Sequence, residues 1–226
     1  MKDEIISVRR MDLALLHPAL HEDAYRDIEE RDAIGLVIKA GGGALAFVLD
    51  NRFALRDLGM FEPALISAFT GCRMNFNEWQ AKEIEGLFKM CDRDKLWAAG
   101  DEPPPGDRWT VYRGVAGKRG QRKVRGLSWT SSRDQACWYA LRLDLPDPAV
   151  YSATVGRQDV YCFSDDRDEQ ECICRPRSPR RLVITVDEMR EGQSRIEQMN
   201  TPEAMMKRLD DYLDEKLSKE PCEALG

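Results

Sequence analysis

Three short motifs hold the residues of this chain that are best suited to chemistry. They are Tyr112-Arg113-Gly114, Ser128-Trp129-Thr130 and Glu169-Gln170-Glu171, in that order along 226 residues. An arginine offers a planar fork of fixed positive charge that binds a pyrophosphate through two hydrogen bonds. A glycine after it lets a ligand approach the backbone closely. The first motif therefore predicts a site that binds a dinucleotide such as NAD.

The two glutamates of the third motif supply the opposite charge. Departure of nicotinamide from NAD leaves a ribose with oxocarbenium character, and a carboxylate beside that cation stabilises it in the transition state. Residues i and i+2 of a strand share a face, so we expect Glu169 and Glu171 to face one cleft. By the same rule Ser128 and Thr130 share a face, and we expect their hydroxyls to orient Glu171.

Together these motifs resemble the mono-ADP-ribosyltransferases of the Arg-Ser-Glu class, in particular the phage and bacterial toxin members. The family shows an aromatic-Arg-Gly strand, a Ser-x-Ser/Thr strand followed by a helix, and a Glu-x-Glu turn leading into a strand. The resemblance covers roughly residues 108–187, about a third of the chain. Trp129 departs from the family pattern, in which the middle position of the second motif is usually small.

The resemblance implies a role for each matching residue. Arg113 would bind an NAD phosphate or the adjoining ribose, and Gly114 the nicotinamide carboxamide. Ser128 and Thr130 would support the site, and an aromatic residue of the following helix would pack against nicotinamide. Glu171 would be the catalytic glutamate, and Glu169 would orient or deprotonate the acceptor. The candidate aromatic residues are Trp138 and Tyr139.

A basic loop joins the first two motifs and carries five positive charges without an acid: Lys118, Arg119, Arg122, Lys123 and Arg125. We expect this loop to bind the acceptor, as a positively charged surface for a phosphate-bearing substrate such as RNA or for an acidic protein surface. In the family, Glu at the position of Glu169 accompanies arginine acceptors. The acceptor therefore stays open between a protein arginine, RNA and water.

Ordinary structural explanations compete with each of these interpretations. Arg113 also fits a surface ion pair, and the acidic stretch 165–171 also fits a solvated loop. Trp138 and Tyr139 are expected to serve the core first, because Ala136, Tyr139, Ala140 and Leu143 recur at helical spacing. On these grounds the alternative function is a non-catalytic interaction module that binds a host or partner protein through charged helices.

Composition argues against several classes of protein and of functional site. The net charge of −6 disfavours indiscriminate nucleic-acid binding. Seven cysteines without a paired framework fit a reducing cytoplasm, and no metal site is expected. The only histidines, His17 and His21, lie far upstream and are expected at a helix start, so histidine-dependent nucleophilic catalysis is not expected at the motifs. The apolar stretch 33–49 is interrupted by Lys39 and three glycines, and predicts no membrane span but two strands, or a helix, a break and a strand.

The expected class is α+β, and the resemblance implies an ADP-ribosyltransferase-like β-sandwich of mixed short strands with an N-terminal helical region and a C-terminal helix. We expect a helical region at 1–106 that ends in a Pro-rich linker, an NAD-binding core at 107–188 and a helical tail at 189–226. Strands are predicted at 109–113, 125–130, 149–155, 158–163, 171–175 and 181–186, with a helix at 133–143. An apolar stripe from Met205 to Leu217 is expected to pack on the N-terminal helices or to dock a neutralising partner.

Overall fold

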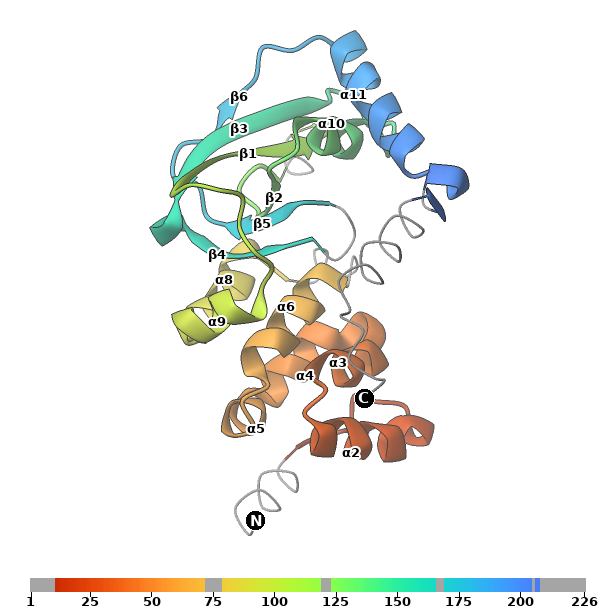
Figure 1. Ribbon diagram of the computed structural model, residues 1–226, viewed down its shortest axis with the longest axis vertical. Coiled ribbons are helices and arrows are strands. Elements are labelled where there is room, and N and C mark those ends of the chain that lie inside the picture. Colours follow the sequence, from red (N-terminus) through yellow and green to blue (C-terminus); the bar gives the residue numbers. More distant parts are fainter. Residues whose placement is uncertain (1–10, 72–78, 119–122, 166–168, 205, 208–226) are drawn as a thin grey trace, which may run out of the picture. The chain divides into compact units, whose positions relative to one another are not determined.

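Nine helical segments make up the described part of the chain before residue 100 (Figure 1). The computed structural model describes residues 11–71, 79–118, 123–165, 169–204 and 206–207. The short 3-10 turn η1 leads into α2 at His21, where His17 Nδ1 accepts a hydrogen bond from the Ala19 amide at 3.2 Å. The prediction of a helix start at the histidines is therefore confirmed. The segments are η1 (Pro18–Leu20), α2 (His21–Glu30), α3 (Ala33–Ala40), η2 (Gly41–Gly43), α4 (Ala44–Asp50), α5 (Arg52–Asp57), α6 (Phe61–Gly71), α8 (Ala81–Met90) and α9 (Arg93–Ala99).

The apolar faces of these helices form one hydrophobic core. Helix α6 lies at its centre, since it contacts α3, α4, α5 and α9. Phe47, Phe61 and Phe69 are almost fully buried there, and burial of such a side chain contributes about 1.5–3 kcal/mol. Ile173 and Cys162, which come from strands, belong to the same core.

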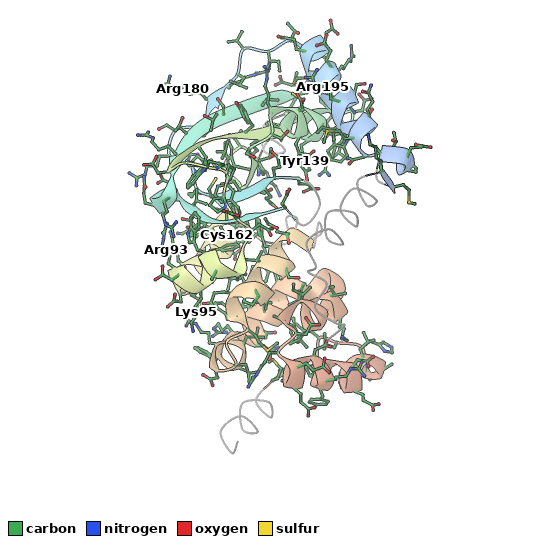
Figure 2. The ribbon with its side chains drawn as sticks, in the orientation of Figure 1. Arg93, Lys95, Tyr139, Cys162, Arg180 and Arg195 are labelled. Atoms are coloured by element: carbon green, nitrogen blue, oxygen red, sulfur yellow. The ribbon has the colours of Figure 1, made fainter. Side chains whose placement is uncertain are left out.

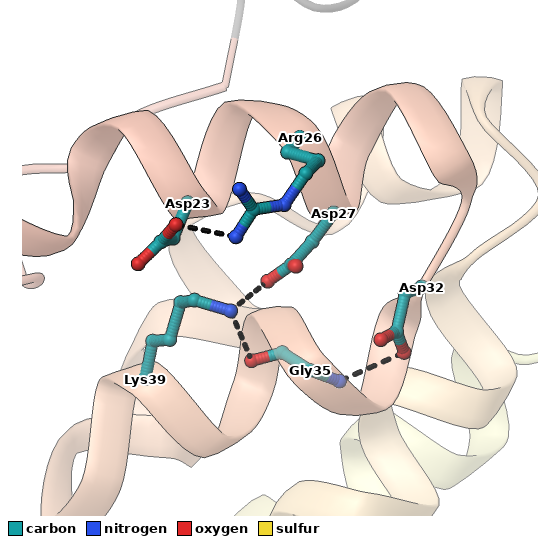
Figure 3. Close-up of polar contacts among 6 residues, drawn as sticks. All are labelled: Asp23, Arg26, Asp27, Asp32, Gly35 and Lys39. Atoms are coloured by element: carbon teal, nitrogen blue, oxygen red, sulfur yellow. Dashed lines mark hydrogen bonds and ion pairs between the residues drawn. The ribbon is translucent and has the colours of Figure 1, made fainter.

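An ion pair joins α2 to α3 (Figure 3). Lys39 Nζ pairs with the carboxylate of Asp27 and also donates to the Gly35 carbonyl oxygen at 3.4 Å. Asp32 caps α3, where its side chain accepts the Gly35 amide at 2.8 Å. Because Asp27 is only 6% exposed, its charge depends on Lys39 for compensation.

The apolar stretch 33–49 forms two helices, α3 and α4, separated by the 3-10 turn η2. The prediction of two strands, or of a helix followed by a strand, is therefore wrong. The alternation of apolar runs and glycines in this stretch does not distinguish a strand from a buried helix, because a short helix that is buried on most sides is also continuously apolar. By length and hydropathy, Ala33–Asp50 passes the test for a membrane-spanning helix, although 44% of the window is buried inside the protein. Buried core helices pass the same test.

The described strands belong to one six-stranded antiparallel sheet, in the order β4-β5-β2-β1-β3-β6 (Figure 1). The α+β class is thus confirmed, and the described strands form one sheet rather than the two of a sandwich. The predicted strand 181–186 is wrong in extent, since the strand that pairs with β3 consists of Arg180 and Arg181 alone. The strands are β1 (Arg108–Val115), β2 (Ser128–Thr130), β3 (Ala149–Gly156), β4 (Val160–Ser164), β5 (Glu171–Cys174) and β6 (Arg180–Arg181).

Contacts divide the chain into two units, whose boundary runs through β1 and β3. The first holds the chain up to Val111, together with Arg125–Ser131 and Ala153–Ser178, and the second holds Tyr112–Val124, Ser132–Ser152 and the chain from Pro179. The segment expected as a linker, 100–107, lacks regular structure, but the Asp101 amide donates to the Phe163 carbonyl oxygen at 3.0 Å. It is therefore part of the first unit.

The second unit is built on the packing of two helices, α10 (Arg133–Leu141) and α11 (Val186–Met199). Ser132 caps α10 by accepting the Gln135 amide at 3.2 Å, as the sequence predicts. The Arg195 guanidinium forms two hydrogen bonds of 2.7 and 2.8 Å to the carboxylate of Asp134, which ties the two helices together. Figure 2 labels Arg195. At Gly192 a Cβ would lie 3.1 Å from the Cβ of Cys137, so the glycine permits this close approach. Most of the predicted apolar stripe beyond Met205 lies outside the described residues.

Candidate active site

Glu171 occupies the middle of a buried polar row that crosses three strands. The backbone register places Thr130 of β2 on one side of Glu171 and Ser164 of β4 on the other. Directly paired residues of antiparallel strands face the same side of a sheet, so the carboxylate lies between two hydroxyl-bearing residues. Thr130, Ser164 and Glu171 are only 4%, 4% and 7% exposed. A buried carboxylate beside hydroxyls is held in place and acts in a low dielectric, where it attracts a cation more strongly than in water.

The next row of the same face is apolar. Ile173 pairs with Ser128 on β2 and with Cys162 on β4, and both Ile173 and Cys162 belong to the main hydrophobic core. Burial, and then the nearby charge of Glu171, raise the pKa of the Cys162 thiol well above its usual value. Glu171 therefore lies where the hydrophobic core gives way to polar side chains.

Glu169 does not lie on the strand, contrary to the prediction that both glutamates share a strand face. Strand β5 begins at Glu171, and Gln170 before it has a left-handed backbone with φ of 46°. The alternation of side chains along a strand therefore does not apply to Glu169, which is half-buried in the turn. The reason is local: a left-handed residue turns the chain, and no periodicity in the sequence reveals it.

One hydroxyl of the second motif has a role that the sequence analysis did not predict. Thr130 Oγ1 donates to the backbone carbonyl oxygen of Glu169 at 2.8 Å, so it supports the turn as well as standing opposite Glu171. Ser128 stands opposite Ile173 and is half-buried. The large Trp129 is buried opposite Cys172 and donates through Nε1 to the Gly126 carbonyl oxygen at 3.0 Å. Because Trp129 uses the other face of β2, its size does not displace Thr130 from Glu171.

Apart from Arg125, which is in the first unit, the remaining predicted site residues belong to the second unit. Arg113 is held there by the basic loop. Arg113 Nε donates to the Lys123 carbonyl oxygen at 3.0 Å, and the side chain is half-buried. At the other end of the loop, the Gly117 amide donates to the Pro146 carbonyl oxygen at 2.7 Å. The direction of the Arg113 guanidinium is therefore set by the loop backbone.

Gly114 is in contact with helix α10. A Cβ at this position would overlap the carbonyl oxygen of Ala136 and lie 2.6 Å from the backbone nitrogen of Ala140. Ala136 and Ala140 are themselves fully buried, so small residues line both sides of the contact. The sequence analysis explained Gly114 by close approach of a ligand, whereas the structure explains it by close packing of a helix on a strand.

Trp138 and Tyr139 form a cluster with Arg142 at the end of α10. The two rings meet edge to face with centroids 5.2 Å apart, and the Arg142 guanidinium lies 5.3 Å and 4.7 Å from their centroids. Figure 2 labels Tyr139 on this helix. The predicted core face is confirmed for Ala136 and Ala140, which are buried. It is wrong for Leu143, which is 64% exposed. Both aromatic residues are half-buried.

The basic residues are placed only in part. Lys118, Lys123 and Arg125 are exposed, and the predicted Arg119 and Arg122 lie outside the described residues. A second basic cluster, 176–181, is largely paired: Arg177 with Asp159 and Arg181 with Asp147, each at 3.2 Å.

Sequence reasoning missed Ser164, Asp165 and Asp101. Ser164 ends a strand whose partner was unknown, so nothing in the sequence placed it beside Glu171. Asp165 lies five residues before Gln170 and accepts its amide at 2.9 Å, and Asp101 in turn accepts the Asp165 amide at 2.7 Å. Aspartates that cap a turn are a recognisable signal, but the acidic stretch 165–171 offered several candidates.

The predicted residues thus fall into two groups, each assembled within its own unit. Glu169, Glu171, Ser128 and Thr130 belong to the first unit, and Arg113, Gly114, Trp138 and Tyr139 belong to the second. Among the described residues, no group of three or more His, Cys, Asp or Glu side chains is placed to hold a metal. Comparisons with protein-family models, with curated proteins and with solved structures gave no match for this chain.

Proposed function

We propose that this protein is an NAD-dependent mono-ADP-ribosyltransferase, with an ADP-ribosyltransferase-like fold, that acts on a macromolecule in the cytoplasm as a toxin or phage effector. The observation that carries the proposal is the buried row Thr130–Glu171–Ser164. It sets a carboxylate at the end of a motif where the resemblance expects the catalytic glutamate. The fixed position of this carboxylate means that little reorganisation is needed when positive charge develops near it.

The reaction breaks one glycosidic bond and forms another. The bond between ribose C1′ and the nicotinamide nitrogen breaks, and its electron pair leaves with nicotinamide, which becomes neutral. Glu171 stabilises the resulting positive charge on the ribose. A lone pair of the acceptor nitrogen or oxygen then forms the new bond to C1′, and the acceptor loses one proton, for which Glu169 is the base. With water as acceptor the new bond joins C1′ to the water oxygen, the proton passes to solvent, and the outcome is NAD hydrolysis.

In this proposal the first motif and helix α10 supply the residues that bind the rest of NAD. Arg113 binds the pyrophosphate through its guanidinium group. Gly114 offers backbone hydrogen bonds to the nicotinamide carboxamide, and Trp138 or Tyr139 packs against the ring. The strand order supports this assignment, since β5, β2 and β1 are consecutive and carry Glu171, the second motif and the first motif respectively.

The acceptor is a protein arginine or RNA. Glu169 favours a guanidinium acceptor through the resemblance, and the exposed Lys118, Lys123 and Arg125 favour a phosphate-bearing one. Labelled NAD incubated with protein and cell lysate, then divided between RNase and protease treatment, distinguishes them. Label that survives RNase but not protease identifies a protein acceptor.

The central test is release of nicotinamide from NAD by the purified protein. We expect wild-type turnover and a fall of at least about a hundredfold in Glu171→Gln, because the amide keeps the shape but loses the charge. Glu191→Gln, an exposed glutamate of α11, is the matched control and keeps full activity. Equal nicotinamide release by wild type and Glu171→Gln would refute the enzymatic proposal and favour the interaction module.

NAD binding tests the role of Arg113 separately. We expect Arg113→Ala to weaken NAD binding by about 10- to 100-fold, since a charge-assisted pair contributes about 1.5–3 kcal/mol. Arg180→Ala on β6, an exposed arginine of the same unit, is the control. Titration calorimetry measures both, and unchanged affinity in Arg113→Ala would remove this residue from the site.

A further inference from the structure

The turn Glu169–Gln170–Glu171 is fastened on one side to the end of β2. The Ser131 amide donates to the Gln170 carbonyl oxygen at 3.1 Å, and Ser131 Oγ donates to Gln170 Oε1 at 3.0 Å. Thr130 Oγ1 donates to the Glu169 carbonyl oxygen at 2.8 Å. These three bonds hold the carbonyl groups of the turn and one side chain.

The other side of the turn is fastened by two aspartates. The Gln170 amide donates to Asp165 Oδ1 at 2.9 Å, and the Asp165 amide donates to Asp101 Oδ2 at 2.7 Å. The Asp101 amide then donates to the Phe163 carbonyl oxygen at 3.0 Å. This relay connects the turn to the segment that follows α9, and all of its members belong to the first unit.

The turn needs this relay because Gln170 has a left-handed backbone, with φ of 46°. That conformation is unfavourable for a residue with a side chain and persists where neighbouring bonds enforce it. The hydrogen bond to Asp165 holds the backbone N–H of this left-handed residue. Removing it frees the chain to leave that conformation.

Glu169 and Glu171 are held in place by different interactions. Glu171 is fixed by strand pairing on both sides, to Thr130 and to Ser164. Glu169 lies outside the strand and depends on the turn. A change in the turn can therefore move Glu169 while the register keeps Glu171 in place.

We infer that Asp165, held by Asp101, is a positioning residue that sets the place of Glu169 and so directs ADP-ribose to the acceptor rather than to water. The inference rests on the proposed function. In transfer, the C1′–nicotinamide bond breaks, a C1′–N bond to a guanidine forms, and Glu169 takes the proton that the guanidine loses. In hydrolysis water supplies the oxygen and needs no oriented partner, because it is small and abundant.

The test measures both products of one reaction. Purified full-length protein is incubated with NAD and agmatine, a small guanidine, and chromatography quantifies total nicotinamide and ADP-ribosylagmatine. A parallel arm with labelled NAD measures transfer to the RNA and protein of a cell lysate. We expect Asp165→Ala to lower transfer about 10- to 100-fold, as misplacement of a catalytic group does, while hydrolysis stays within about twofold.

Conservative and matched variants separate positioning from loss of folding. Asp165→Asn keeps an amide oxygen that accepts the same Gln170 bond, so we expect it to restore transfer to within about threefold of wild type. Asp107→Ala, at an exposed aspartate of the first unit, leaves both products unchanged. Hydrogen exchange of the Gln170 amide gives an independent readout: protection is lost in Asp165→Ala and kept in Asp165→Asn.

Each outcome has one meaning. If wild type releases no nicotinamide, the proposed function fails and this inference fails with it. If wild type cleaves NAD but transfers to neither acceptor, or if Asp165→Ala lowers hydrolysis and transfer in proportion, NAD cleavage stands and the inference is overturned. An Asp165→Asn variant as impaired as Asp165→Ala also overturns it.

Discussion

Replacing Gly114 with alanine tests whether this glycine serves helix packing or only a ligand. The added methyl group would overlap the Ala136 carbonyl oxygen and lie 2.6 Å from the Ala140 nitrogen. Both are backbone atoms of α10, so no side-chain rotation relieves the contact and the whole helix has to shift. Overpacking of this kind costs about 1–3 kcal/mol, and a clash with backbone belongs at the upper end.

The net effect follows from two opposing terms. Alanine also reduces the entropy of the unfolded chain, which returns about 0.4–1 kcal/mol. We therefore expect Gly114→Ala to lower the free energy of unfolding by about 2 kcal/mol. For a protein of this size that corresponds to a fall in Tm of about 4–8 °C.

Gly86 provides a control, because alanine at this position should raise the free energy of unfolding rather than lower it. It lies in the exposed interior of α8, where an added Cβ meets no atom within 4 Å. Alanine there improves helix propensity, and we expect Gly86→Ala to stabilise the protein by about 0.5–1 kcal/mol.

Urea denaturation and thermal unfolding measure both variants, and hydrogen exchange of the amides in 133–141 locates the effect on α10. A Gly114→Ala variant with wild-type stability and wild-type protection of α10 would refute the packing argument. If that variant also lost NAD binding, Gly114 would serve the ligand alone.

Three further predictions concern charge and the cysteines. Lys39→Met leaves the buried Asp27 carboxylate unpaired and should cost about 2–4 kcal/mol in urea denaturation, with part of the loss recovered in the double variant Asp27→Asn/Lys39→Met; an additive double variant would contradict the pairing. The Arg195 hydrogen bonds lower the pKa of Asp134 from 3.8, so their stabilisation is present above that value and is lost as the pH falls through the lowered pKa. The stability difference between wild type and Arg195→Gln should therefore shrink in acid, and a constant difference down to pH 2 would disagree. Burial raises the pKa of Cys91 to about 12 and of Cys137 to about 11, and Cys162, Cys172 and Cys174 are fully buried. A thiol reagent at pH 8 should therefore label these five cysteines only after unfolding. Rapid labelling of any of them in the folded protein, located by mass spectrometry, would contradict this.

Local signals in the sequence located helix α10 and most of the strands correctly. Ser132 before an apolar-rich segment predicted the start of α10, because a hydroxyl cap satisfies a free amide whatever surrounds it. The strands at β1, β3 and β5 were predicted within a few residues, since β-branched and aromatic runs favour extended backbone. These features depend on neighbours a few positions away, which the sequence displays directly.

The sequence by itself therefore determined the α+β class, helix α10, most of the strands, and the candidacy of Arg113 and Glu171. Only the tertiary structure decided that Ser164 stands opposite Glu171, that α10 presses on Gly114, and that Asp165 holds the turn at Gln170. Strand register and packing bring together residues that are far apart in the chain, and a residue with a left-handed backbone produces no periodic pattern in the sequence. Their energies come from neighbours that folding brings together, so no local pattern could have revealed them.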